Sequence, residues 1–255
     1  MAAALTTSAS AKWREWTIFA LAVVSFFALF FIPRFGQDPA YHDFADRRAF
    51  MGIPNFFDVA SNAVYFIVGA LGLWLCVRRS LSIAWIVLFA GVFLVSLGSG
   101  YYHWHPTNTT LVWDRLPMTV GFMGLFTALL CEHVGKRSDY LLLPLLILGA
   151  ASVLYWHFTD DLRFYAWVQA FPLLTIPVVM ALFPAEYSHR WMLLAALGLY
   201  ISAKFTEVYD DSILRATGNV FSGHTIKHLL SGVGSLFLYV MLRNRRRVAP
   251  GSGHR

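Results

Sequence analysis

Three histidines at the ends of apolar segments have a spacing that suits a metal ion. His224 and His228 are four residues apart, so on a helix they share one face and lie about 6 Å apart along its axis. His103 lies at the end of a second apolar segment. Neutral imidazole is a preferred zinc ligand, and three protein ligands with a fourth position open to water describe a catalytic zinc site. The alternative is three hydrogen-bonded core histidines. Because ionisable groups inside an apolar span are costly and by default mark function, we predict a metal site.

A serine and an aspartate accompany His103. Ser99 lies four residues before it on the same helix face, and Asp114 is expected to open the next apolar segment, brought level with His103 by the turn at Pro106. Asp114 would act as a base or hydrogen-bond acceptor for water at the metal, or it is an acid that favours the positive end of a helix dipole. Ser99 would stabilise a developing oxyanion, or it only bonds to the carbonyl one turn earlier. His105 is expected to be solvated.

The segments that carry these residues are apolar enough to lie in a membrane. Of the 255 residues, 58% are hydrophobic and 13% are charged, whereas about one quarter are charged in typical soluble domains. Crossing a bilayer takes roughly 20 apolar residues. Eight such runs lie at about 15–33, 55–77, 82–103, 116–133, 140–157, 164–183, 190–208 and 222–243. We therefore predict an all-α integral membrane helical bundle with no room for a separate soluble domain.

The charge distribution predicts how the bundle is oriented. The first run follows Lys12 and Arg14 and could be a cleaved signal peptide, but it lacks a small-residue cleavage pattern, so we expect a retained anchor helix. With eight spans both termini share one side, and most basic residues lie on that side, which is therefore expected to be cytoplasmic. The metal site would face the exoplasmic or periplasmic space. The net charge of +6 reflects this topology. It does not indicate a nucleic-acid partner, because the basic residues are scattered without interleaved stacking aromatics.

Three short motifs resemble those of the alkaline ceramidases. They are "LGSGYYH" ending at His103, "DRLPM" starting at Asp114, and "HTIKHLLSGVGSL" starting at His224. The Ser-x3-His, Asp and His-x3-His pattern is the signature of the CREST superfamily of membrane hydrolases, which also includes the progestin and adipoQ receptors. Leu-Pro-Met after the aspartate and Gly-x-Gly-Ser after the last histidine favour the ceramidase branch. The resemblance spans about residues 44–243.

The resemblance implies a zinc-dependent hydrolase that cleaves the amide bond of a ceramide or phytoceramide-like lipid. His103, His224 and His228 would bind zinc, while Asp114 and Ser99 would assist the attack of water on the carbonyl. It also implies seven core transmembrane helices at 41–243, after an N-terminal tail and extra transmembrane helix at 1–40 and before a basic cytoplasmic tail at 244–255. The expected partners are the lipid amide and membrane lipids, and no protein partner can be inferred.

Calcium is a second cofactor that the resemblance raises. In eukaryotic members an acidic loop and a glutamate at the start of the first core helix help to bind it, and the stretch at 52–65 resembles that helix start. Asn55 stands where the glutamate aligns. Asp43, Asp46 and Asn55 are therefore the candidate calcium ligands, since a hard cation prefers oxygen ligands. The alternative is a solvated loop in which Asp43 or Asp46 pairs with Arg47 or Arg48.

Further polar residues lie near the predicted site. Asp58 and Asn62, on one face of the second span, are expected to serve polar packing or hydrogen bonds that support the histidines. Lys204 and Glu207 are predicted to form an ion pair, the alternative being a headgroup pocket. Lys227 is expected to point away from the ligand face toward the surface.

Two other functions compete with hydrolysis. One is a membrane signalling protein like the adipoQ receptors, in which the zinc is structural; the short cytoplasmic loops offer it little coupling surface. The other is a metal-ion transporter, which would need polar ligands at several depths, whereas the three histidines lie at one end of the spans.

Overall fold

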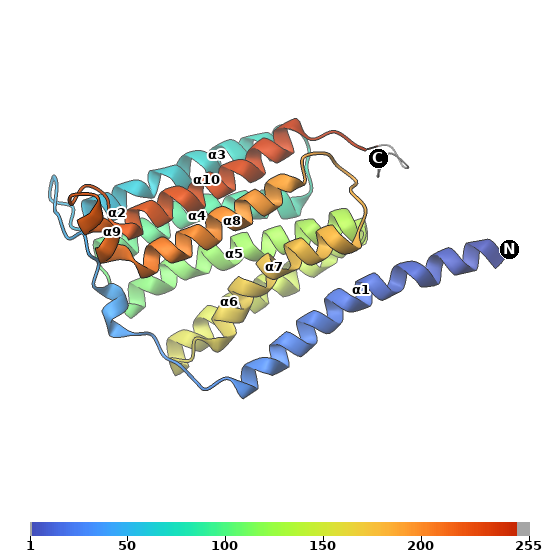
Figure 1. The fold of residues 1–255 in the computed structure, drawn as a ribbon, viewed down its shortest axis with the longest axis horizontal. Coiled ribbons are helices and arrows are strands. Elements are labelled where there is room, and N and C mark those ends of the chain that lie inside the picture. Colours follow the sequence, from blue (N-terminus) through green and yellow to red (C-terminus); the bar gives the residue numbers. More distant parts are fainter. Residues whose placement is uncertain (1, 249–255) are drawn as a thin grey trace.

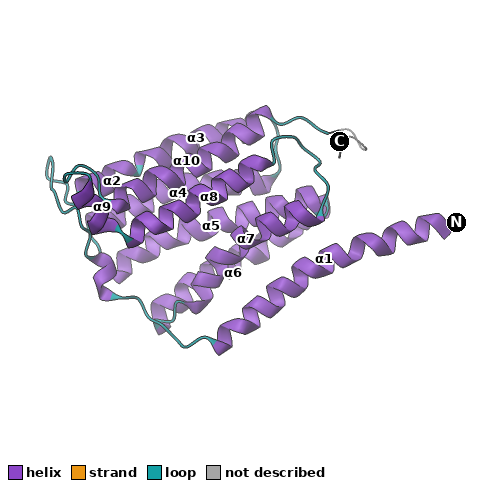
Figure 2. Cartoon of the chain, viewed as in Figure 1, coloured by secondary structure: helices purple, strands orange, loops and turns teal. Residues whose placement is uncertain are grey.

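The protein is a bundle of long helices that run roughly side by side (Figures 1 and 2). The computed structural model describes residues 2–248, and their side chains from residue 12 onward except that of Lys136. The end of the predicted basic tail, residues 249–255, lies outside the described residues. Within the described range the long elements are α-helices, which confirms the predicted fold class. They are α1 (Ala2–Ala28), α2 (Phe56–Ser61), α3 (Ala63–Arg78), α4 (Ile83–Trp104), α5 (Asn108–His133), α6 (Leu142–Thr159), α7 (Arg163–Leu182), α8 (Trp191–Val208), α9 (Asp210–Ala216) and α10 (Gly223–Asn244), with short 3-10 turns at Leu29–Phe31, Pro39–His42 and Lys136–Leu141.

Eight of the helical segments in the described range are long and apolar enough to cross a membrane. Their order and number agree with the eight predicted runs. The second is built from α2 and α3, which join at Asn62. The protein is therefore a multi-pass membrane protein.

The fourth span begins eight residues earlier than predicted. Thr107 caps α5 by accepting from the backbone N–H of Thr110, while the Thr110 hydroxyl accepts from the backbone N–H of Thr107. This capping box lets a polar Asn-Thr-Thr stretch start the helix, although hydropathy alone places the start at residue 116. Asp114 therefore lies inside the helix, beyond its first turn. The prediction that Asp114 opens the helix and favours its dipole is wrong for this reason.

The first helix lies outside the main bundle. It runs along α7 and diverges from the other helices toward its N-terminus (Figure 1). Ile18 is its one buried residue among those with described side chains, and Trp167 of α7 donates to the Ser25 hydroxyl at 2.9 Å. The remaining spans pack against one another, and buried residues of α3, α4, α5, α7, α8 and α10 form one large apolar core.

Small residues allow α4 and α5 to approach closely along most of their length. A Cβ atom on Gly91 would collide with the backbone of Gly121, and one on Gly98 would collide with the carbonyl oxygen of Trp113. Close helix packing through glycine is common in membranes, where association depends on van der Waals contact. The contact at Gly98 is next to Ser99 and Asp114, so it sets the distance between these two side chains.

Replacing Gly98 with alanine is expected to lower the stability of the bundle by about 1–3 kcal/mol, because the added methyl group meets backbone atoms that cannot rotate away. Thermal unfolding of the detergent-solubilised protein would measure the loss. Gly100→Ala is the matched control, since no heavy atom lies within 4 Å of its added Cβ and alanine favours a helix. Equal thermal unfolding midpoints for Gly98→Ala and Gly100→Ala would contradict the close contact between Gly98 and the Trp113 carbonyl.

Candidate metal centre

The three histidines converge in the interior at one end of the bundle. His103 lies near the C-terminal end of α4, and His224 and His228 lie in the first turns of α10. Their exposed fractions are 0%, 3% and 2%, and one ring nitrogen from each lies within 4.8 Å of the others. The ring centroids are 4.6 to 4.9 Å apart. Residues 121 and 125 positions apart in the sequence thus form one compact cluster.

The hydrogen bonding of the rings suits a metal ion. Both ring nitrogens of His103 are buried and have no hydrogen-bond partner within the described part of the chain, an arrangement that costs free energy unless a ligand is bound. In His228, Nδ1 lies 2.7 Å from the Ser61 hydroxyl, which leaves Nε2 for the cluster. A histidine ligand usually has its second nitrogen held in this way. The donor set therefore fits zinc, which binds neutral imidazole in sites of three protein ligands.

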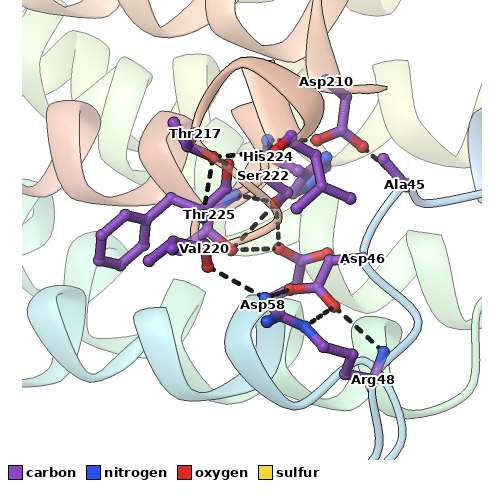
Figure 3. A network of polar contacts seen from close by, with 12 residues as sticks. Ala45, Asp46, Arg48, Asp58, Asp210, Thr217, Val220, Ser222, His224 and Thr225 are labelled. Carbon is purple, nitrogen blue, oxygen red and sulfur yellow. Dashed lines mark hydrogen bonds and ion pairs between the residues drawn. The ribbon is translucent and has the colours of Figure 1, made fainter. Parts of the chain in front are cut away.

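A buried aspartate holds the start of α10 in place. Ser222 caps the helix by accepting from the backbone N–H of Thr225 at 2.9 Å. The Ser222 and Thr225 hydroxyls both donate to Asp58 Oδ1, at 3.1 and 2.7 Å (Figure 3). Asp58 comes from α2, so it ties α2 to the helix that carries two of the histidines. The Asp58 carboxylate therefore supports the histidines through this helix start and not through a hydrogen bond to their rings. The Asn62 side chain donates to the Asp58 and Val59 carbonyls.

A second aspartate fixes His224 itself. Asp210 of α9 accepts from the backbone N–H of His224 at 2.7 Å and from that of Ala45 at 3.0 Å (Figure 3). One carboxylate thus joins the first turn of α10 to the loop before α2. That loop also carries Phe44, whose ring lies against His103 and His224 with centroids 4.6 and 4.9 Å away.

The three candidate calcium ligands have other partners. Asp43 pairs with Arg47, and Asp46 accepts from Arg48 at 2.6 to 3.1 Å, so the ion pairs are those that the sequence left as the alternative. Asn55 donates its side-chain amide to the His103 carbonyl at 2.8 Å. Its backbone adopts a left-handed conformation, with φ of 47°, that asparagine tolerates better than most residues. These contacts do not direct the three side chains to one cation position.

The ion pair of Asp46 and Arg48 fastens the loop before α2 to the segment before α10. Asp46 is 1% exposed, and Arg48 also donates to the Val220 carbonyl at 3.0 Å, which links the loop to the segment before α10 (Figure 3). Burial by itself raises the pKa of Asp46, but the hydrogen bonds and charge of Arg48 outweigh it and hold that pKa below its ordinary value. The pair therefore stabilises the fold only while Asp46 is ionised.

We expect Asp46→Asn to destabilise the protein by about 1.5–3 kcal/mol at neutral pH, because it removes a buried charge that accepts hydrogen bonds from Arg48. In the native protein this stability is present above about pH 4, the usual aspartate pKa, and is lost as the pH falls through the lowered pKa of the folded state. Thermal unfolding across pH would measure it. Asp43→Asn breaks an ion pair with both side chains 65% exposed and should cost less than about 1 kcal/mol. If Asp43→Asn lowered the free energy of unfolding more than Asp46→Asn, the stabilising role of the Asp46–Arg48 pair would be refuted.

Ser99 and Asp114 lie beside the histidines in the wall of a cavity. Both are buried, at 2% and 7% exposure, and the Ser99 hydroxyl faces the Asp114 carboxylate. Together with His228 they line one end of a cavity of about 150 Å³ between α4, α5, α7, α8 and α10. A histidine, a serine and an aspartate thus line the same cavity.

The rest of that cavity is mostly apolar. Its lining continues to Leu88 of α4, Leu125 of α5 and Leu238 of α10. Leu238 lies ten residues beyond His228, so the cavity extends roughly 15 Å along the bundle from the histidines. Such a space is suited to a hydrocarbon chain whose polar end lies at the histidine cluster.

A cluster of charged residues, Lys204, Glu207 and Lys227, lies beside the histidines. The sequence predicted only the pair of Lys204 with Glu207. Glu207 pairs with Lys204 at 2.8 Å, as predicted, and also with Lys227 at 2.7 Å. The Tyr41 hydroxyl donates to the same carboxylate at 2.9 Å. Lys227 lies 3.0 Å from Nε2 of His224 and is only 15% exposed, so the prediction that it reaches toward the surface is wrong. The attraction of Glu207 across the helix interface keeps it inside.

The sequence analysis did not predict several residues that contact the histidines or their charged neighbours. Ser61 lies three residues after Asp58 on the polar face of the second span, and this spacing was a usable signal. Tyr41, Phe44 and Asp210 lie in loops or at the start of a short helix, where no periodic pattern marks them. His105 is exposed at the end of α4, as expected.

Comparison with known proteins agrees with the motifs. A search of the curated proteins finds no match to this chain. The ceramidase family matches residues 50–250, which include α2 to α10 and with them the histidine cluster, Ser99 and Asp114. Because this match covers most of the chain and the whole bundle that builds the candidate metal centre, the chain belongs to the ceramidase family.

Proposed function

We propose that the protein is a zinc-dependent hydrolase that cleaves the amide bond of a ceramide or phytoceramide-like lipid and releases a fatty acid and a sphingoid-type amine. The observation that carries the proposal is the buried histidine cluster, with both nitrogens of His103 unpartnered among the described residues, at the polar end of an apolar cavity. Membership of the ceramidase family supports the reaction class.

The side chains around the cavity have distinct roles in this proposal. Zinc held by His103, His224 and His228 would polarise the amide carbonyl and lower the pKa of water to about 7. Asp114 would accept the proton of the attacking water and pass it to the leaving amine. Ser99 would donate a hydrogen bond to the carbonyl oxygen as its negative charge develops. The burial of Asp114 and Ser99 favours the proton transfer and the hydrogen bond to the carbonyl oxygen, since hydrogen bonds and charges act more strongly where water is excluded.

The apolar part of the cavity would hold the acyl chain. It begins beside His228 and extends between the helices toward Leu238, so a chain entering it would place its carbonyl near Ser99 and Asp114. We further propose that both termini are cytoplasmic and that the site lies on the exoplasmic or periplasmic side, on the basis of the distribution of basic residues. Calcium is not included in the proposal, because Asp43 and Asp46 are paired with arginines.

The test is metal analysis of the purified protein combined with fatty-acid release from lipid amides and from esters of the same acyl chain. We expect bound zinc and release from amides, loss of both after chelation, and recovery with added zinc. Release from esters alone would rule out the amidase. Bound zinc without release from any substrate would favour a receptor-like protein with a structural metal.

A further inference from the structure

The cavity beside the histidines ends at the same depth on three helices. The lining residues farthest from the site, which we call the floor of the cavity, are Leu88 of α4, Leu125 of α5 and Leu238 of α10. The first lies eleven residues before Ser99, the second eleven residues after Asp114, and the third ten residues after His228. At a rise of 1.5 Å per residue, all three helices place the floor roughly 15–17 Å from the candidate site.

The interior beyond the floor is filled with side chains. One turn farther along the same three helices lie three described residues that are each 1% exposed and outside the cavity lining: Trp85, Leu129 and Leu242. They share the helix faces of the floor leucines, because residues three or four positions apart lie on one side of a helix. All six residues belong to one buried apolar core. An acyl chain therefore cannot continue straight past the floor without displacing packed side chains.

Polar contacts hold the tryptophan below the floor in place. Trp85 donates its ring N–H to Glu132 at 2.7 Å, and Glu132 also pairs with Arg245 at 2.5 Å. The guanidinium of Arg245 lies 5.7 Å from the centre of the Trp85 ring. Rotating this ring away would leave a buried N–H without its partner, which is costly. The floor is thus backed by a side chain that does not yield easily to a longer ligand.

A glycine widens the cavity on the way to the floor. Gly121 lies seven residues after Asp114, which is roughly 10 Å along α5. It is buried and lines the cavity, yet a Cβ atom on it would meet no heavy atom of another helix closer than the Leu88 carbonyl oxygen, at 3.8 Å. The open space beside this buried residue is therefore the cavity itself. A side chain at this position would narrow the path to the floor.

We infer that the floor limits the length of the acyl chain, and that the preferred lipid amide carries an acyl chain of no more than about 12 carbons. The inference rests on the proposed hydrolysis and narrows its substrate class. Carbon–carbon bonds of about 1.5 Å at tetrahedral angles advance an extended chain by about 1.25 Å per carbon, so about 12 carbons reach from the histidines to the floor. A longer chain gains nothing from its extra length, because the lipid that it leaves is as apolar as the cavity.

Ceramides with saturated acyl chains of 8, 10, 12, 14 and 16 carbons on one sphingoid base test the inference. We expect kcat/KM to stay level up to about 12 carbons and to fall by about tenfold or more beyond that length, as expected when extra methylene groups are forced into a packed interior. A level profile from 8 to 16 carbons would overturn the inference while hydrolysis itself stands.

Two variants should move this limit in opposite directions. Leu238→Ala opens the floor and should lengthen the limit by about two carbons, whereas Gly121→Val narrows the cavity and should shorten it to about eight carbons. Leu194→Ala and Gly198→Val make the same changes at exposed positions of α8 outside the described cavity lining, and should keep the limit of the unmodified protein. An unchanged limit in either Leu238→Ala or Gly121→Val, in a variant that folds, would overturn the inference.

A binding measurement separates this result from a failure of the proposed hydrolysis. Alkyl ureas of the same chain lengths have a carbonyl that resists attack, and quenching of tryptophan fluorescence would report their affinity for the full chain. Comparing Leu238→Ala with the unmodified protein at each length cancels the partition of the urea into detergent. The two affinities should be equal at 8 carbons, and the variant should bind about tenfold more tightly at 14. Equal affinities at every length would overturn the inference even if the protein hydrolysed no amide.

Discussion

Replacing His103 with alanine is expected to abolish both zinc binding and fatty-acid release. The imidazole is buried between the two other histidines, and neither nitrogen has a partner within the described chain that could explain its burial. Loss of residues that merely support a ligand costs 10- to 100-fold in metal affinity or activity, so loss of the ligand itself should reduce activity by more than about 100-fold. Metal content per protein and initial rates of fatty-acid release would measure the two effects together.

His105→Ala is the matched control for this experiment. It removes the same side chain two positions away, but His105 is exposed at the end of α4 and lies outside the cluster. We expect its zinc content and activity to stay near those of the unmodified protein. A His103→Ala variant that retained stoichiometric zinc and full activity would remove the metal site from the proposal.

Asp114→Asn should keep zinc bound but reduce kcat by about 10²- to 10⁴-fold, the range for loss of a general base. Asparagine has nearly the same shape and can still bond to Ser99, so packing in α5 should be preserved. It cannot accept a proton from water at neutral pH. Steady-state kinetics together with metal analysis would distinguish this result from loss of the metal.

Asp211→Asn is the matched control for Asp114→Asn, because it makes the same aspartate-to-asparagine change outside the candidate site. Asp211 is exposed on α9, pairs with Arg215 and lies at the same end of the bundle. Its replacement should leave kcat within about twofold of the unmodified protein, as expected for a surface ion pair. Activity of Asp114→Asn as high as that of Asp211→Asn would exclude Asp114 as the base.

The spans could be predicted because hydropathy over 20 residues is set by local composition. The exception is informative: the fourth span was predicted from residue 116, but α5 begins at Asn108. A hydropathy window does not detect a capping box of two threonines, which starts a helix through side-chain hydrogen bonds. The error moved Asp114 from the interior of the helix to its start and so left its role open.

The loop before α2 could not be predicted in the same way. Asp43 and Asp46 are both followed closely by arginines, and the sequence allowed either calcium or ion pairs. Only the folded chain shows that Asp46 is buried and paired with Arg48, while Asp43 and its partner Arg47 are both exposed. Arg48 differs from Arg47 because it also donates to the carbonyl of Val220, which lies 172 positions away in the sequence. That contact holds Arg48 in place beside Asp46.

The sequence by itself determined the eight apolar spans, the helix face shared by His224 and His228, and the face shared by Ser99 and His103. These depend on the helical period, which acts between residues three or four positions apart. Tertiary structure alone decided that His103 meets the other two histidines, that Ser61 holds His228, and that Glu207 draws Lys227 into the cavity wall. Which faces of separate helices meet is set by packing between backbones, such as the close approach of α4 and α5 at Gly98, and no local pattern contains that information.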